Sequence, residues 1–292
     1  MRGDPETHEL LAPGTLSGVL SLMAGEPGEW TPIAGGTELM VAHAAGKLTA
    51  RKLVSLWGIR ELRFIRVEPD SIAVGAGSTF YDLRNHPTVS PEFPLLAKSA
   101  SWIGSVANQS RATLGGNLVN GSPAADSSPA LLAYDAEVEL MSAGGTRRVP
   151  YAEFHTGYKR NVLAADELLY AVHLPRRFAQ HRQYLRKVGT RRAMAISKAA
   201  LAGCALVEQG VVREILLGAA SVAAFPTRLY RSEDSIRGKA VAPETLQAAR
   251  AAALAEILPI DDIRSTAEYR RIVTINLLME FLGSLTETGA QT

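Results

Sequence analysis

The sequence predicts a protein of two domains in the α/β or α+β class. Short β-branched runs alternate with alanine-rich stretches of helical periodicity, and Gly or Pro residues separate them. The chain has 292 residues, a length typical of about two domains. Seven of the residues from Arg176 to Arg192 are Lys or Arg. We place the domain boundary near the start of this basic segment.

The first domain is expected to alternate helices and strands. The expected helices span residues 15–23, 39–45, 79 onward and 94–103, and the expected strands span 31–34, 52–56 and 71–74. Thr79 and Asp82 have the spacing of a capping box. Residues 104–128 carry many polar side chains and glycines, so ordinary core packing does not explain them.

Two hairpins and two long helices are expected further along the chain. Residues 137–141 and 147–149 flank Gly144-Gly145, which predicts a hairpin with a primed turn. A strand at 168–174 ends at Pro175. A second hairpin joins 199–207 to 211–217 at Gln209-Gly210, and helices at 243–257 and 265–282 follow. The second domain is therefore a small sheet packed against helices.

Composition excludes several classes of protein. The 31 Lys and Arg residues balance 29 Asp and Glu residues, so no net field favours nucleic acid or an anionic membrane. Pro13, Gly14 and Gly18 interrupt the longest uncharged stretch, so no membrane span is expected. Residues 1–6 carry acids where a signal peptide needs basic residues, which predicts a cytoplasmic protein. The single cysteine, Cys204, excludes an internal disulfide, a Cys-based zinc site and an iron–sulfur cluster held by this chain.

Several familiar motifs fail on spacing. Gly75-Ala76-Gly77 follows a strand, but Phe80 occupies the third glycine position of a Rossmann fingerprint. Gly46-Lys47-Leu48 lacks the hydroxyl and the preceding glycines of a P-loop. The six histidines do not have metal-ligand spacing beside Glu or Cys. Cys204 lies in an apolar run and is expected to be a small buried hydrophobe.

Two glycine loops remain as candidate sites. In the first, Ile33-Ala34-Gly35-Gly36-Thr37-Glu38, paired glycines between a strand and a helix let backbone N–H groups form an anion-binding nest, although an ordinary turn has the same composition. The second, Thr113-Leu114-Gly115-Gly116-Asn117, continues through Asn120 to Asp126. Asp126 is either the N-cap of a helix at 127–133 or an acceptor for a ribose or ribityl hydroxyl. Together the loops suggest a dinucleotide clamped by its pyrophosphate, and FAD fits better than ATP.

These motifs together resemble the FAD-binding medium subunit of the molybdenum hydroxylases, a family that includes xanthine dehydrogenase and carbon monoxide dehydrogenase. The resemblance covers nearly the whole chain. It rests on Ala34-Gly35-Gly36-Thr37-Glu38, Thr113-Leu114-Gly115-Gly116-Asn117, Ser122-Pro123-Ala124-Ala125-Asp126, Pro129-Ala130-Leu131-Leu132-Ala133, Gly157-Tyr158-Lys159, Asp166-Glu167-Leu168-Leu169, and Lys187 followed by Arg191-Arg192.

The resemblance implies an α+β fold. Residues 1–178 would form a vanillyl-alcohol-oxidase/PCMH-type FAD-binding domain of two α/β subdomains. Residues 179–287 would form a small α+β domain with an antiparallel sheet and helices, and 288–292 a tail.

The resemblance also assigns roles to residues. One segment would wrap the pyrophosphate of FAD: Ile33, Ala34, Gly35, Gly36, Thr37 and Glu38. Thr113, Gly115, Gly116 and Asn117 would contact the phosphates and ribityl chain, Asn120 belongs to the same cofactor-binding segment, and Asp126 would hold a sugar hydroxyl. Ile103, Leu169 and Lys187 occupy positions that approach FAD in relatives.

Two positions after the domain boundary bear on the flavin. From the residues themselves, Lys187 is either a cation that stabilises anionic reduced flavin or a solvated lysine. Relatives often carry an Asp-Ile pair where this chain has Ala195-Ile196. Loss of that acid predicts a flavin potential higher than in relatives that carry it.

The implied function is that of an oxidoreductase subunit. FAD would collect electrons from [2Fe–2S] clusters on a small partner subunit, after a large partner subunit oxidises a substrate at its molybdopterin cofactor. NAD, dioxygen, a quinone or a carrier protein would accept the electrons. The flavin carries the chemistry, so no catalytic side chain and no metal ligand is expected here. The alternatives are a self-contained reductase resembling the cell-wall precursor enzyme MurB, and an assembly subunit that has lost FAD.

Overall fold

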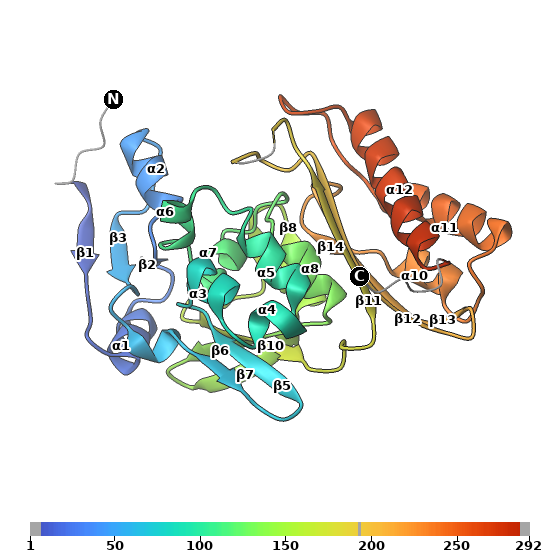
Figure 1. Cartoon of the computed structure of the whole chain (residues 1–292). Coiled ribbons are helices and arrows are strands. Elements are labelled where there is room, and N and C mark those ends of the chain that lie inside the picture. The colour runs from blue at the N-terminus through green and yellow to red at the C-terminus, as the bar shows by residue number, and fades with distance from the viewer. Residues whose placement is uncertain (1–6, 192–193, 287–292) are drawn as a thin grey trace.

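A computed structural model describes residues 7–191 and 194–286 of the chain. Figure 1 shows three groups of elements in chain order: a small sheet at the N-terminal end, a central group of short helices above a second sheet, and a C-terminal sheet with long helices. Residues 1–6, Arg192 and the expected tail at 288–292 lie outside the described residues. No helix in the described ranges is long and apolar enough to cross a membrane.

The N-terminal group is a parallel three-stranded sheet in the order β1-β3-β2. Its elements are β1 (Glu9–Leu11), α1 (Leu16–Gly25), β2 (Trp30–Ile33), α2 (Leu39–Ala44) and β3 (Lys52–Ser55). Thr15 caps α1 by accepting a hydrogen bond from the Gly18 N–H, as the Ser/Thr preference at this position favours. Val19 and Val54 are fully buried in the cluster between helix and sheet. The sheet ends where the first glycine loop begins.

The second sheet has five antiparallel strands in the order β4-β5-β10-β6-β7. These are β4 (Ile65–Val67), β5 (Ser71–Gly75), β6 (Glu137–Ser142), β7 (Gly145–Pro150) and β10 (Leu168–Pro175). The predicted hairpin at Gly144-Gly145 is confirmed. Its predicted primed turn is wrong, because the positive φ falls on Gly145, after the two turn residues.

Short helices and a two-stranded antiparallel sheet, formed by β8 and β9, accompany this sheet. They are η2 (Arg60–Leu62), α3 (Phe80–Asn85), α4 (Val89–Glu92), α5 (Pro94–Ala100), α6 (Val106–Gln109), α7 (Leu114–Val119), α8 (Ser128–Ala133), α9 (Tyr151–Phe154), β8 (His155–Gly157) and β9 (Arg160–Asn161). The capping box of Thr79 and Asp82 is confirmed. The helix expected to reach Ile103 ends at Ala100. Two short helices, α6 and α7, lie in the region 104–128 that composition left unexplained, and α8 begins at its last residue.

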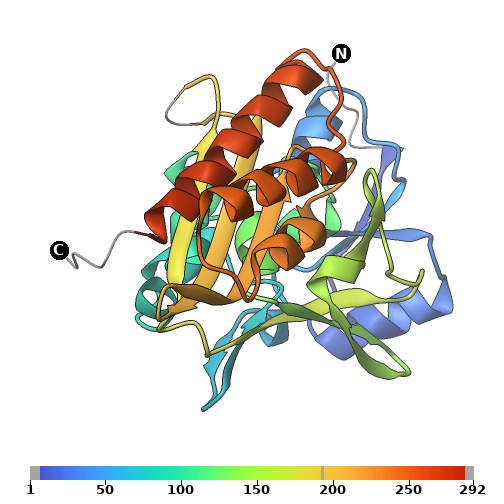
Figure 2. The same ribbon diagram turned by 90° about the vertical axis from the view of Figure 1, so that its right-hand side faces the viewer.

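The C-terminal group is a four-stranded antiparallel sheet in the order β11-β12-β13-β14, with three helices on one face (Figure 2). Its elements are β11 (Arg182–Val188), β12 (Ala199–Glu208), β13 (Val211–Ala220), β14 (Thr227–Arg228), α10 (Tyr230–Ile236), α11 (Pro243–Glu256) and α12 (Ala267–Ser284). Gln209 and Gly210, the two residues that join the expected hairpin, have φ of 51° and 75°, the pattern of a primed turn. The hairpin and both long helices are confirmed.

The opposite face of this sheet packs on the central group. All six residues of α8 are buried, and a Cβ on Gly218 of β13 would overlap the Pro129 carbonyl of that helix. Ala202, Cys204 and Leu216 join the same apolar cluster as the central helices. Cys204 is fully buried, as expected, and burial raises the pKa of its thiol. The core is therefore continuous across the expected domain boundary.

The basic segment from Arg176 is built into the fold and is not a solvated linker. Arg176 pairs with Glu92 at 2.7 Å, and Arg186 with Glu280 at 2.9 Å. Residues 182–188 form β11, which pairs with β12 along its length. Among the described residues the cations of this segment mostly have partners within the chain, so the segment is not a free basic patch.

The buried His155 gives the fold a pH dependence. Its Nε2 lies 3.3 Å from the Tyr151 hydroxyl, and burial lowers its pKa to about 4 from the ordinary 6.5. Between these values the unfolded chain binds a proton that the folded chain does not, so stability is full above pH 6.5 and falls as the pH is lowered. The lowered pKa of His155 reduces the free energy of unfolding by about 2 kcal/mol between pH 7.5 and pH 5.

We predict that His155→Gln loses this part of the pH dependence. Urea unfolding of the wild type and the variant at pH 7.5 and pH 5 measures it. The free energy of unfolding should fall less for the variant than for the wild type between the two pH values. An equal fall in both proteins contradicts the prediction.

Candidate functional site

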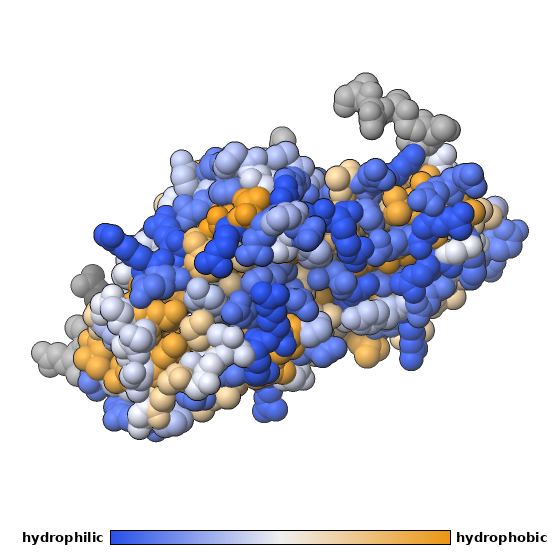
Figure 3. Space-filling view, turned by 90° about the horizontal axis from the view of Figure 1, so that it is seen from below, coloured by the Kyte–Doolittle hydropathy of each residue, from blue (hydrophilic) through white to orange (hydrophobic). Residues whose placement is uncertain are grey.

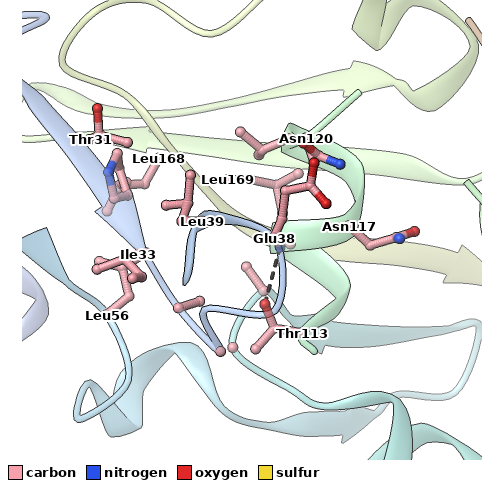
Figure 4. Close-up of a pocket in the computed structure, with 18 of the residues that line it drawn as sticks. Thr31, Ile33, Glu38, Leu39, Leu56, Thr113, Asn117, Asn120, Leu168 and Leu169 are labelled. Atoms are coloured by element: carbon pink, nitrogen blue, oxygen red, sulfur yellow. Dashed lines mark hydrogen bonds between the residues drawn. The ribbon is translucent and has the colours of Figure 1, made fainter. Parts of the chain in front are cut away.

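A cavity of about 570 Å³ opens between the N-terminal sheet and α7. Its size lies within the range of about 300–1,000 Å³ that is typical of small-molecule and cofactor sites. Its wall comes from β2 and the loop after it, the end of β5, α7 and the start of β10. Figure 4 shows Ile33 and Leu56 on one side, and Asn117 of α7 with its flanking residues Thr113 and Asn120 on the other. Stretches of chain that are distant in sequence therefore meet around one space.

Most of the residues predicted from the sequence line this cavity. They are Ile33, Ala34, Gly35, Gly36, Thr37, Glu38, Ile103, Thr113, Gly115, Gly116, Asn117, Asn120 and Leu169. The two exceptions, Asp126 and Lys187, lie outside the lining and contact each other. The structure therefore brings both glycine loops to one cavity.

The first glycine loop leaves backbone donors free at the cavity wall. The Leu56 N–H binds the Ile33 carbonyl at 2.8 Å, and the Met40 N–H binds the Gly36 carbonyl at 2.9 Å, so both ends of the loop are fixed. Gly36 has φ of 74°, a conformation that favours glycine. Within residues 7–191 and 194–286, the N–H groups of residues 35–37 have no hydrogen-bond acceptor. Such a group of unbonded amides suits an anion.

The second loop differs from the expected amide nest. The Leu114 and Gly115 N–H groups bind the Ser78 and Ala76 carbonyls, each at 2.9 Å. The Gly116 N–H binds Thr113 Oγ1 at 3.1 Å, the dashed line in Figure 4. These donors are already used in capping α7 and anchoring it to β5. The loop therefore offers exposed Gly116 and polar side chains to a ligand, rather than a free nest.

Asn117 is oriented for a ligand by a neighbour. Its Oδ1 accepts a hydrogen bond of 2.7 Å from the Ser127 hydroxyl, which leaves the amide NH₂ as a donor. Asn117 and Asn120 lie on α7 at the cavity wall (Figure 4). The wall of α7 is therefore polar and neutral.

Two small residues of the site were not predicted from the sequence. Ala76 and Gly77 line the cavity, although they belong to the segment that was rejected as a Rossmann fingerprint. A Cβ on Gly75 would overlap the Leu62 carbonyl, and one on Gly115 would lie 2.6 Å from Ala76 Cβ. Gly75 and Gly115 therefore allow η2 and α7 to pack closely against the end of β5. The sequence feature that could have identified Ala76 and Gly77 is the cluster of small residues directly after a strand.

An apolar wall was also missed. Trp30, Leu56, Leu62 and Leu168 line the cavity beside the predicted Leu169, and Leu62 is almost fully buried. These residues come from different elements and have the pattern of ordinary core residues. Sequence spacing gave no signal that they surround a cavity.

The outer surface also varies along the molecule. Seen from below, hydrophobic residues gather most at the end that carries the N-terminal elements, and hydrophilic residues dominate the C-terminal end (Figure 3).

Charged side chains at the cavity include Glu38, which lies 3.6 Å from Lys159 across the wall. The cavity is thus mainly apolar with a few charged groups.

Asp126 and Lys187 form a buried ion pair. The Lys187 Nζ lies 2.8 Å from Asp126 Oδ2, and the two side chains are 9% and 13% exposed. Lys187 is therefore not a solvated lysine. Asp126 does not cap α8, since Ser127 is the N-cap and makes no side-chain capping bond. Burial raises the pKa of Asp126 to about 6, against the opposing effect of the Lys187 ammonium.

This pair lies next to the cavity and has an unused acceptor. The Asp126 Oδ1 is buried and has no hydrogen-bond partner among the described residues. Its chain neighbour Ser127 binds Asn117 of the cavity wall, and Lys187 lies 6.0 Å from the Trp102 ring, beside Ile103 of the wall. A buried oxygen without a partner is rare and indicates a place for a ligand hydroxyl or a water.

The chain matches two protein-family models that together cover most of it. Residues 6–177 match the FAD binding domain in molybdopterin dehydrogenase. Residues 184–285 match the CO dehydrogenase flavoprotein C-terminal domain.

Individual proteins of this family are similar over nearly their whole length. The chain is 31% identical to the xanthine dehydrogenase FAD-binding subunit of Escherichia coli O157:H7 over 258 residues, or 88% of each chain. It is 29% identical to the carbon monoxide dehydrogenase medium chain of Hydrogenophaga pseudoflava over 274 residues, covering 91% of this chain and 92% of that one.

A solved structure has the same fold. It is a chain of carbon monoxide dehydrogenase from Hydrogenophaga pseudoflava lacking the Mo-pyranopterin moiety of the molybdenum cofactor. The TM-score is 0.91 at 26% identity, over 97% of this chain and 99% of that one. The predicted fold class and the predicted cofactor, FAD, are thereby confirmed. The chain belongs to the FAD-binding (medium) subunits of the molybdopterin dehydrogenases, whose other cofactors sit on partner subunits.

Proposed function

We propose that FAD binds in the 570 Å³ cavity with its pyrophosphate against the first glycine loop. The observation that carries this proposal is the set of unbonded N–H groups at residues 35–37 on the wall. They supply donors for phosphate oxygens without needing a positive side chain. Gly116 and the side-chain amides of Asn117 and Asn120 would contact the neighbouring phosphate and ribityl groups. The residues present therefore fit the cofactor.

The remaining predicted residues would hold the flavin half of FAD. Ile103 and Leu169 give an apolar surface that excludes water from a planar ring. The free Oδ1 of Asp126 would accept a hydrogen bond from a sugar hydroxyl, while Oδ2 keeps its bond to Lys187. Lys187 thereby fixes Asp126 and adds a positive charge beside Trp102. In this proposal the division of the chain lies near residue 178, so both expected domains contribute to FAD binding.

The proposed role is electron transfer within a complex of three kinds of subunit. FAD supplies two-electron redox chemistry when it is bound. This chain binds and orients it, and no side chain acts as an acid, base or nucleophile. A large subunit would oxidise the substrate at molybdopterin, and a small subunit would deliver the electrons through [2Fe–2S] clusters. NAD or dioxygen would accept them.

Purification of the complex from its source cell tests this role. Recovery of a molybdopterin subunit, an iron–sulfur subunit and one FAD per medium chain supports it. Reduction by substrate, followed by reoxidation with NAD or with dioxygen, identifies the acceptor. A homomer that turns over an organic substrate without partners supports the self-contained reductase instead. A complex whose medium chain holds no FAD after reconstitution supports the assembly subunit.

We predict that Thr37→Asp abolishes FAD retention. The new carboxylate would lie beside the unbonded N–H groups and repel the pyrophosphate. An acid just before a helix is compatible with folding. The FAD dissociation constant should rise at least tenfold, or about 1.4 kcal/mol or more, as measured by flavin fluorescence of the purified chain.

The matched control is Thr37→Asn, which has nearly the same shape and no charge. It should retain FAD with an affinity within a few fold of the wild type. Equal loss in both variants shows a steric effect, and full retention in Thr37→Asp shows that the pyrophosphate lies elsewhere.

We predict that FAD affinity falls as the pH is lowered through about 6. Asp126 has its pKa near this value, and its ionised form is the stronger acceptor for a sugar hydroxyl. The affinity should therefore be highest above pH 6.5 and decrease towards pH 5. In Asp126→Asn the affinity should be about tenfold lower at pH 7.5 and should not change between pH 5 and pH 7.5.

Asp70→Asn is the control, because Asp70 is an exposed carboxylate on the turn between β4 and β5. It should keep the wild-type pH profile. A profile in Asp126→Asn that matches the wild type contradicts the role of Asp126.

A further inference from the structure

Arg111 connects the two glycine loops, although it does not line the cavity. Its guanidinium carbon lies 4.0 Å from the centre of the Trp57 ring. Its Nε donates a hydrogen bond of 3.3 Å to the Gly35 carbonyl. Among the described residues it forms no ion pair. An exposed arginine that contacts both an aromatic ring and a backbone carbonyl is placed to hold the conformation of the loop that carries this carbonyl.

The backbones of the two loops also touch. A Cβ on Gly35 would overlap the Arg111 carbonyl, so only glycine fits there. The Arg111 and Ala112 N–H groups bind the Asn108 carbonyl at the end of α6, at 3.1 and 2.7 Å. The Arg111 backbone is therefore fixed by its own helix, and Gly35 rests against it.

Peptide geometry links this contact to the cavity. In a trans peptide the C=O of one residue and the N–H of the next point in opposite directions. The chain has no cis peptide among its described residues. A hydrogen bond that holds the Gly35 carbonyl towards Arg111 thus turns the Gly36 N–H away from Arg111. That N–H is one of the unbonded donors at the cavity wall.

Trp57 is a fixed surface for the guanidinium. It follows Leu56, whose N–H binds the Ile33 carbonyl at the start of the first loop. Trp57 is itself exposed, at 39%, so its ring is open to the guanidinium. A planar guanidinium stacks flat on such a ring while its edge still donates hydrogen bonds, a geometry that a tetrahedral lysine ammonium does not reproduce.

We infer that Arg111 is a positioning residue for FAD: it stacks on Trp57 and holds the Gly35 carbonyl, which orients the Gly36 N–H towards the pyrophosphate. This inference rests on the proposed position of the pyrophosphate at the first loop. Arg111 acts through the loop and not through its charge, because it lies outside the cavity lining. Replacement by lysine therefore removes its function even though the charge remains.

The test compares FAD release from the purified full-length chain. Arg111→Lys and Arg111→Met should both release FAD about fivefold to twentyfold faster than the wild type. Trp57→Leu should have a similar effect, and the Trp57→Leu, Arg111→Lys double variant should be no worse than the more severe single variant. Binding of riboflavin, which lacks the pyrophosphate, should not change. Urea unfolding of the FAD-free proteins should give the wild-type midpoint.

Arg66→Lys is the matched control, because the guanidinium of Arg66 on β4 lies 5.0 Å from the Phe64 ring and makes no contact with a glycine loop. It should release FAD at the wild-type rate. Wild-type release from Arg111→Lys overturns the inference, because charge would then be sufficient. A lowered unfolding midpoint or weakened riboflavin binding in the Arg111 variants also overturns it, because the role would then be structural.

The Thr37 variants separate this inference from the proposed function. If Thr37→Asp loses FAD and Arg111→Lys does not, the pyrophosphate position is correct and only the role of Arg111 fails. If Thr37→Asp retains FAD, the proposed position itself is wrong.

Discussion

The site depends on close contacts between backbones that only glycine permits. Gly35 rests on the Arg111 carbonyl, Gly115 on Ala76, and Gly75 on the Leu62 carbonyl. Each contact joins elements that are distant in sequence, and together they set the width of the cavity. A side chain at any of these positions would separate the walls. The glycines of the second loop therefore shape the cavity by packing, while those of the first loop also provide donors to it.

A second constraint joins the cavity to the C-terminal sheet. Helix α8 is buried on all sides, and Gly218 of β13 lies against it. Asp135, just after α8, binds Arg228 of β14, which also pairs with the fully buried Glu233 at 2.8 Å. Breaking such a buried pair leaves a charge without a partner, which is strongly destabilising. The C-terminal helices thus support the Asp126–Lys187 pair from outside, through β11 and α8.

The sequence was most informative where chemistry and local geometry coincide. Gln209-Gly210 between two apolar runs predicts a hairpin, and Thr79 with Asp82 predicts a helix start through hydrogen bonds three residues apart. The first loop was identified for the same reason. Loop 33–38 and residues 113–117 together also carry the family resemblance, which reaches further than any local pattern.

Long-range contacts explain what the sequence did not predict. The amides of Leu114 and Gly115 are used by Ser78 and Ala76 of another segment, and no local rule reports this. Strand β11 was hidden because its cations suggest solvent, whereas their partners, Glu280 and Asp126, lie far away in the chain. Trp30 and Leu62 resemble core residues from their sequence, and only the assembled fold leaves a space beside them.

The burial of Cys204 has a consequence for resistance to oxidants. The chain has one cysteine, and it lies between the C-terminal sheet and the central helices with its pKa raised, so it does not form a thiolate there. Peroxide and disulfide reagents attack thiolates, so this sulfur is protected in the folded chain. Among the described residues, the exposed methionines Met40 and Met194 carry the sulfur atoms that oxidants meet first. Met40 belongs to α2, directly after the first glycine loop, so sulfoxide formation would place a polar group next to Gly36 of that loop.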